Sequence, residues 1–245
     1  MRVTALTRSL SAALLILFGL AAAAVPQISA ADTRDAAQQR VSASRDVLHQ
    51  LIGMPDRGAP DWLLARAQGI AVIPGVIKIG FIVGGRRGHG LLFVRGKHGR
   101  WSDGSFITLT SGSIGWQIGA QSTDVVLVFT TPQSIRGIRK GQFTLGADAS
   151  VAAGPVGRSA SAGTNVKLRA EVYSYSRSRG LFAGVSLDGG ALQIDHKTNR
   201  AYYGNDTSTD RILATPPLKA PAAMKRLRDM LDRYAPTKAQ QKAPD

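Results

Sequence analysis

Short runs of β-branched residues and glycine dominate the chain from residue 70 to residue 203. Val, Ile, Thr and Phe favour extended backbone, and turn signals such as Ser111-Gly112 and Asp188-Gly189-Gly190 separate the runs. The candidate strands are residues 70–73, 76–83, 90–95, 106–110, 113–121, 125–130, 142–146, 150–156, 167–176, 181–187, 191–195 and 200–203. Because most of them have no helical pattern between them, the sequence predicts an antiparallel meander or barrel.

The stretch SGSIGWQIGAQSTDVVLVF, residues 111–129, is central to this pattern. Its first part alternates, with Ile114, Trp116 and Ile118 on one side and glycine or glutamine on the other. Its last part, Val125 to Phe129, does not alternate and predicts a strand buried on both faces. Neither this stretch nor GGRRGHG has the Lys-Ser or Lys-Thr pair of a nucleotide P-loop, so the glycines indicate close packing.

Helical patterns flank the strand-rich region. Residues 32–54 carry apolar residues and a serine at three- and four-residue spacing, and residues 221–234 do the same around Met224, Leu227 and Leu231. Residues 60–68 predict a short helix, and SIRGIRK, residues 134–140, predicts a helical turn. The expected fold class is α+β, a central antiparallel, strongly curved or barrel-like sheet with N-terminal and C-terminal amphipathic helices.

The first 31 residues have the layout of a secretory signal peptide. Arg2 and Arg8 precede an apolar stretch over residues 10–25, and small residues follow at Ser29 and Ala30. The chain has no cysteine, which excludes a lipid-attachment cysteine, a disulfide framework and a thiolate metal site. We therefore expect export to the periplasm or envelope, one domain over residues 32–235, and a disordered tail over residues 236–245.

Basic charge is unevenly distributed along the chain, whose formal net charge is +15. No acidic residue lies between Asp61 and Asp103, and two glycine-rich basic segments in this region, GGRRGHG and RGKHGR, predict turns. If the fold brings them together they form one cationic rim; otherwise they are scattered solvated charges. The candidate anion-binding residues are Lys78, Arg86, Arg87, His89, Arg95, Lys97 and Arg100, with Arg40 and Arg45 from the first helix.

Catalytic and metal-binding patterns are weak by comparison. None of the four histidines belongs to a motif such as HExxH, and we expect no cofactor and no metal. His98, Asp103 and Ser105 could form a nucleophilic set, but their crowding predicts a solvated turn. Asp206 and Asp210 lack the alternating oxygen ligands of a calcium loop. The longest apolar run after the leader is broken by Pro74 and Lys78, too short for a membrane-spanning helix.

Several long blocks closely resemble the SYLF domain family. They are AQGIAVIPGVIKIGFIVGGRRGHGLLFVR, GRWSDGSFITLTSGSIGWQIGAQSTDVVLVF, GLFAGVSLDGGALQID and TNRAYYG, and the likeness extends from about Arg34 to Tyr234. The resemblance implies a compact domain with strands at its centre and helices at its ends. It also implies binding to acidic phospholipids (phosphoinositides in eukaryotes), an association with actin, and no enzymatic activity. The chain departs from the family at Asp103, where proline often follows the Trp-Ser pair.

Two functions remain open from the sequence. One is a non-enzymatic protein that binds anionic phospholipid surfaces with phosphoinositide-like headgroups, through its basic residues and the first helix. That helix either lies in the membrane interface or packs on the sheet. The other is a structural or protein–protein interaction module of the envelope that uses the glycine-rich sheet, with a partner the sequence does not name. Nucleic acid is not the expected partner, and a hydrolase ranks third.

Overall fold

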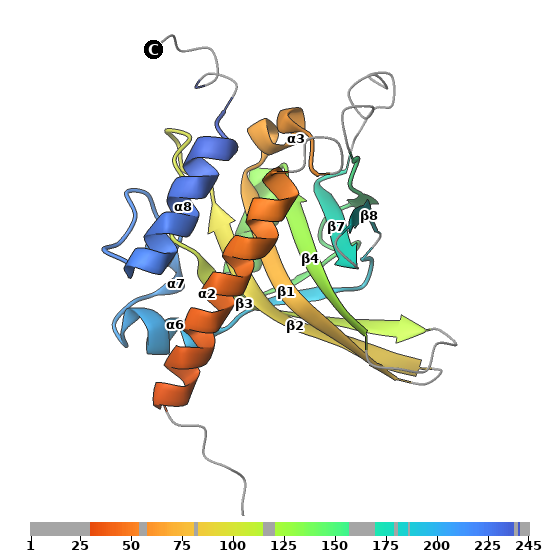
Figure 1. Cartoon of the computed structure of the whole chain (residues 1–245), viewed down its shortest axis with the longest axis horizontal. Helices are drawn as coiled ribbons and strands as arrows, with labels where there is room; N and C mark the ends of the chain where they lie inside the picture. The colour runs from red at the N-terminus through yellow and green to blue at the C-terminus, as the bar shows by residue number, and fades with distance from the viewer. Residues whose placement is uncertain are drawn as a thin grey trace, which may run out of the picture.

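One curled sheet forms the centre of the molecule in a computed structural model that describes residues 30–53, 58–80, 83–114, 121–156, 170–178, 181–185, 187–237 and 240 (Figure 1). The strands are β1 (Gly69–Gly80), β2 (Val83–Val94), β3 (Ser105–Ile114), β4 (Gln121–Phe129), β5 (Gln142–Thr144), β6 (Val151–Ala153), β7 (Val172–Ser178), β8 (Leu181–Gly184) and β9 (Ala191–Ile194). Their order is β5-β9-β3-β2-β1-β4-β7-β6, with β8 also paired to β7. All pairs are antiparallel except β6 with β7.

The helices lie at the ends of the chain and in the connections. They are α2 (Ala30–Ile52), α3 (Asp61–Arg66), α4 (Pro132–Arg139), α6 (His196–Tyr203), α7 (Thr209–Ile212) and α8 (Ala222–Tyr234). Figure 1 shows α2 crossing the sheet, with α6 and α8 beside it. The α+β class, the antiparallel curvature and both terminal helices confirm the prediction. No described helix is long and apolar enough to cross a membrane.

The sheet has an inner and an outer face, each with its own hydrophobic core. The outer face carries Val72, Phe93 and Tyr175, which pack with α2, α3 and α8. The inner face carries Leu127 and Phe143, which pack with α4 and the other strands. Phe129 of β4 contacts Phe143 of β5 with ring centroids 6.2 Å apart, although four strands lie between β4 and β5 in the sheet order. The sheet therefore curls around its inner face as a half-barrel.

The exposed fractions of the side chains decide two local predictions. Every residue from Val125 to Phe129 is at most 3% exposed, which confirms a strand covered on both faces. The apolar stripe of α2 is buried against the outer face, and Ala37, Val41 and Leu48 are at most 1% exposed. Of the two fates left open for this helix, the structure shows packing on the sheet.

Three local predictions are wrong. Gly84 to Gly90 do not form a turn, because antiparallel pairing with β1 and β3 extends β2 through them. Residues 200–203 do not form a strand; they belong to α6, whose first turn is capped by Asp195 accepting from Thr198 N–H at 3.0 Å. The apolar pattern around Met224, Leu227 and Leu231 predicts a buried side of the last helix without Arg228, yet Arg228 is 7% exposed.

Other predictions fall partly or wholly on residues outside the described part of the chain. These are the signal peptide up to residue 29, the alternating stretch over residues 115–120 and most of the tail after residue 237.

Candidate anion-binding site

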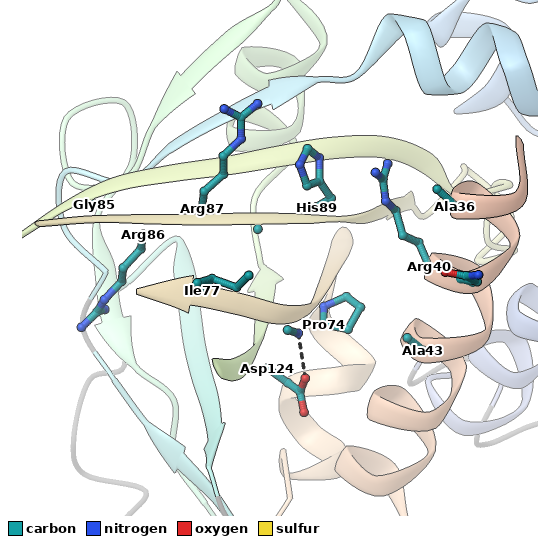
Figure 2. A pocket seen from close by; sticks show the side chains of 13 residues that line it. Ala36, Arg40, Ala43, Pro74, Ile77, Gly85, Arg86, Arg87, His89 and Asp124 are labelled. Carbon is teal, nitrogen blue, oxygen red and sulfur yellow. Dashed lines mark hydrogen bonds between the residues drawn. The ribbon is translucent and has the colours of Figure 1, made fainter. Parts of the chain in front are cut away.

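A cavity of about 890 Å³ lies on the outer face, between the N-terminal half of α2 and the β1–β2 hairpin (Figure 2). Ala36, Arg40 and Ala43 line it from α2 at three- and four-residue spacing, so they share one side of the helix. The two alanines leave space on either side of the arginine. Ile77 of β1 and Arg87 of β2, which are cross-strand partners, line the opposite wall.

A β-bulge in β1 shapes this cavity. The pairing of β1 shifts register between Val72 and Ile77, and Gly75 adopts a positive φ of 60° that few other residues tolerate. The Gly75 N–H donates to Asp124 Oδ1 at 3.0 Å, which fixes the bulge. Beyond the bulge the side chains turn outward, and Ile77 is 47% exposed.

Asp124 also connects the bulge to α2. Its carboxylate accepts from Arg177 Nε at 2.7 Å, and Arg177 in turn donates to the Gln50 side chain of α2. The acid that lines the cavity is therefore already neutralised by an arginine from β7.

Arg87 and His89 lie two residues apart on β2, so both side chains point to the outer face. Figure 2 shows His89 between Arg87 and Arg40, while Arg86 points to the opposite side of the strand. Arg40 Nη1 lies 3.6 Å from Asp195 Oδ2 and donates to Thr198 Oγ1 at 3.3 Å. His89 Nδ1 lies 3.3 Å from Thr108 Oγ1 and 3.9 Å from Asp195 Oδ2.

The surroundings weaken the charge of His89. Burial lowers its pKa below the usual value, Arg40 and Arg87 lower it further, and Asp195 partly opposes them. Burial also lowers the pKa of Arg40, and Asp195 again acts in the opposite direction. An anion bound between Arg40 and His89 would favour the charged forms of both side chains.

The charges around the cavity do not balance. Asp124 is paired with Arg177, and Asp195 is paired with Arg40. Neither Arg86 nor Arg87 has an acidic partner within the described residues. The cavity can therefore accept an anion without breaking an existing ion pair of Arg87.

The remaining predicted residues lie elsewhere. Arg95 is buried, donates to the Leu64 carbonyl at 2.8 Å and stacks over Trp101 at 4.5 Å, and burial lowers its pKa to about 10. Arg100 pairs with Asp232 at 3.0 Å, while Lys97 is exposed in the same turn. Arg45 is exposed and pairs with its neighbour Asp46 at 2.9 Å.

The two basic segments do not form one rim. Arg86 and Arg87 lie near the beginning of β2, whereas residues 95–100 follow its end. With a rise of about 3.3 Å per residue, β2 separates them by roughly 25 Å. Lys78 is the cross-strand partner of Arg86 and faces the inner side with it. The structure thus groups Arg40, Arg87 and His89 on the outer face and Lys78 and Arg86 on the inner face, while Arg86 also lines the edge of the outer-face cavity.

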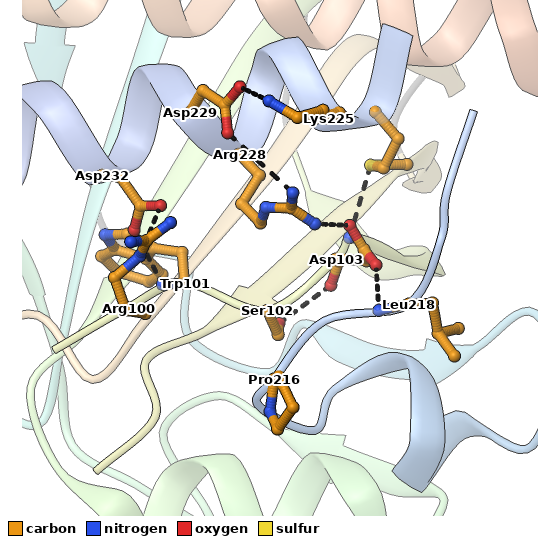
Figure 3. Close-up of polar contacts among 12 residues, drawn as sticks. Arg100, Trp101, Ser102, Asp103, Pro216, Leu218, Lys225, Arg228, Asp229 and Asp232 are labelled. Atoms are coloured by element: carbon orange, nitrogen blue, oxygen red, sulfur yellow. Dashed lines mark hydrogen bonds and ion pairs between the residues drawn. The ribbon is translucent and has the colours of Figure 1, made fainter. Parts of the chain in front are cut away.

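Asp103 and Ser105 of the suggested nucleophilic set are buried and have structural partners, so the solvated-turn interpretation is wrong for those two, whereas His98 is exposed. Asp103 binds Arg228 at 2.6 Å and accepts from the Leu218 N–H at 2.8 Å (Figure 3). Ser105 Oγ accepts from Asn199 Nδ2 at 3.0 Å. The part of the chain that the structure describes contains no group of three or more residues suited to hold a metal ion.

Sequence reasoning did not identify Asp124, Arg177, Asp195 or Thr198 as parts of this region. Asp195 carried a detectable signal, because an acid three residues before Thr198 is a helix-capping pattern. Asp124 carried none, since its partners come from β1 and β7.

Comparison with known proteins identifies the class of this half-barrel domain. A family model for Ysc84, described as Las17-binding protein actin regulator, matches residues 110–234, about half of the chain. The chain belongs to this Ysc84 family, also called the SYLF domain family, which confirms the resemblance seen in the sequence.

Curated relatives agree with the family. The chain is 38% identical over 181 residues to SH3 domain-containing YSC84-like protein 1 of Xenopus laevis, which covers 74% of this chain and 54% of the relative. It is 36% identical over 214 residues to Protein YSC84 of Saccharomyces cerevisiae, covering 86% of this chain and 45% of that protein. LAS seventeen-binding protein 3 of the same yeast is 36% identical over 193 residues, covering 78% and 41%. The chain therefore spans about half the length of the relatives it matches.

Proposed function

We propose that this protein binds anionic phospholipid surfaces with phosphoinositide-like headgroups, without catalysing a reaction, in the periplasm or cell envelope. One observation carries the proposal: Arg87 lines an open cavity together with Arg40 and His89 and has no acidic partner among the described residues. A headgroup phosphate can serve as the anionic partner of Arg87. The leader-like segment over residues 1–31 supports the location.

The proposed contact uses the polar side of α2. Its apolar stripe is buried against the sheet, so the helix would reach the membrane through Arg40 while remaining docked. Ile77, exposed next to Arg87, adds apolar contact at the same edge. Each basic residue near an anionic surface contributes about 1 kcal/mol, and salt screens the attraction.

Vesicle co-sedimentation of the purified chain tests this proposal. We expect binding to vesicles of phosphatidylcholine with phosphatidylglycerol at low salt, and little binding to phosphatidylcholine alone. The double variant Arg40→Gln/Arg87→Gln should weaken binding about 30-fold, because it removes two contributions of about 1 kcal/mol. The matched control Lys97→Gln/Lys219→Gln removes two exposed cations elsewhere and should bind within about threefold of the unchanged chain.

Two outcomes contradict the proposal. Equal binding to neutral and anionic vesicles at low salt would exclude an anion-specific surface. Equal losses in the two double variants would assign the effect to net charge and not to the outer-face cavity. Cell fractionation with sequencing of the mature N-terminus tests the location, and a protein retained in the cytoplasm with an intact leader contradicts it.

The second candidate function is a structural or protein-interaction module. The family description names Las17 binding and actin regulation, and two of the relatives are named as LAS seventeen-binding proteins. A protein partner at the glycine-rich sheet is the corresponding proposal for this chain. Affinity capture from envelope extracts and light scattering test it, and a monomer that captures no partner argues against it.

A further inference from the structure

A second cavity, of about 600 Å³, lies on the inner face of the half-barrel. Its floor is apolar and buried: Val76, Leu109, Val125 and Leu187 are each at most 4% exposed. These residues come from β1, β3, β4 and the segment after β8, so the curvature of the sheet creates the cavity. Closed and partly closed sheets of this size hold one small ligand in the interior, and 600 Å³ lies within the usual range of ligand pockets.

Two cations stand at the edge of this cavity. Lys78 and Arg86 are directly opposite each other in the register of β1 and β2, and both line it. Like charges in that position repel each other. Neither has an acidic partner among the described residues, and no acid belongs to the described lining.

Hydroxyl groups complete the polar edge. Ser111 is the cross-strand partner of Arg86, and Thr123 is the partner of Val76 on the other neighbouring strand. Both line the cavity. The cavity thus combines hydrogen-bond donors and positive charge at one side with an apolar floor at the other, which is complementary to an amphiphile with an anionic head.

We infer that the inner-face cavity binds one single-chain amphiphile with an anionic head, either an alkyl carboxylate or an alkyl phosphate. The head lies between Lys78 and Arg86, where it relieves their mutual repulsion. The alkyl chain lies on the floor formed by Val76, Leu109, Val125 and Leu187, and each buried methylene contributes about 0.8 kcal/mol. This site is additional to the proposed outer-face surface, and it can fail independently.

Calorimetric titration of the purified chain tests the inference, with dodecanoate and dodecyl phosphate used below their micelle concentrations. We expect saturable binding at one ligand per chain for at least one of them, and the stronger one identifies the head. Dodecyltrimethylammonium, which has the same chain and the opposite charge, should bind at least tenfold more weakly. Hexanoate, which keeps the charge and shortens the chain, should also bind at least tenfold more weakly.

Variants locate the site. Lys78→Gln/Arg86→Gln should weaken binding at least tenfold, and removing the repulsive pair should leave the fold intact. The matched control Lys140→Gln/Lys219→Gln removes two exposed cations away from both cavities, and should bind within threefold of the unchanged chain. Ala183→Trp, at an exposed position that lines the cavity, should fill it and abolish binding while circular dichroism remains native.

Several results would overturn the inference. They are no binding of either anion, equal affinity for the cationic amphiphile, or equal losses in the two double variants. The vesicle experiment separates the two sites. If amphiphile binding is absent while vesicle binding persists, the inner-face site is refuted and the outer-face proposal stands. If Arg40→Gln/Arg87→Gln binds vesicles normally and Ala183→Trp loses the amphiphile, the outer-face proposal is refuted and the inner-face site stands.

Discussion

The buried ion pair between Arg228 and Asp103 connects α8 to the segment that leads into β3 (Figure 3). Asp103 is completely buried, Arg228 is 7% exposed, and their closest nitrogen and oxygen atoms lie 2.6 Å apart. The second carboxylate oxygen accepts from the Leu218 N–H at 2.8 Å. Arg228→Met keeps the packing volume but leaves this carboxylate buried without its cation, so we expect the free energy of unfolding to fall by about 3–5 kcal/mol.

Urea denaturation followed by circular dichroism measures this loss. With a slope of about 3 kcal/mol per molar urea, the midpoint should decrease by about 1–1.7 M at an unchanged slope. Lys225→Met is the control, because it removes an exposed ion pair to Asp229 on the same helix and should change stability by less than about 0.5 kcal/mol. The double variant Asp103→Asn/Arg228→Met removes the uncompensated charge, keeps an acceptor for Leu218 N–H, and should recover at least half of the loss.

A loss below about 1 kcal/mol for Arg228→Met, or a loss equal to that of Lys225→Met, would refute this reasoning. The pair would then behave as an exposed ion pair. Failure of the double variant to recover stability would show that packing of the arginine stem, and not the unpaired carboxylate, supplies the effect.

Three further predictions follow from local geometry. Gly90→Ala should lower the free energy of unfolding by about 1–3 kcal/mol, because the added Cβ would collide with the Val72 carbonyl and lie 2.8 Å from Ile73 Cα. An unchanged melting temperature would contradict this. Thr131→Ala removes the oxygen that caps α4 by accepting from Ser134 N–H at 3.4 Å, and should reduce the urea-derived stability by about 1 kcal/mol, whereas Thr131→Ser should retain most of it. Burial, with Arg40 and Arg87 and against Asp195, lowers the pKa of His89 in the folded state, so the free energy of unfolding decreases as the pH falls below the unfolded pKa of about 6.5. His89→Gln should therefore lessen the loss of stability between pH 7.5 and 5.5. Parallel pH profiles of stability for the variant and the unchanged chain would argue against this.

Local patterns in the sequence were sufficient to predict many of the helices and strands of the fold. The three- and four-residue spacing in α2 and α8 predicted helices because one side of each had to be buried. The unbroken apolar run from Val125 to Phe129 predicted a strand covered on both faces, and β4 is buried in that way. The same patterns misjudged α6, because its Tyr202–Tyr203 pair has strand propensity while the cap from Asp195 and the packing against α2 favour a helix.

The grouping of the basic residues depended on contacts between distant segments. The sequence established by itself an acid-free, basic stretch and a family with this fold, because composition and motifs are local properties. Only the tertiary structure decided which charges meet, because strand register and the bulge at Gly75 are fixed by pairing across the sheet. It placed Arg87 at the same cavity as Arg40 of α2, paired Arg86 with Lys78 on the inner face, and buried Arg95 against Trp101. The acid-free basic stretch thus contributes cations to both faces of the sheet and one buried structural contact.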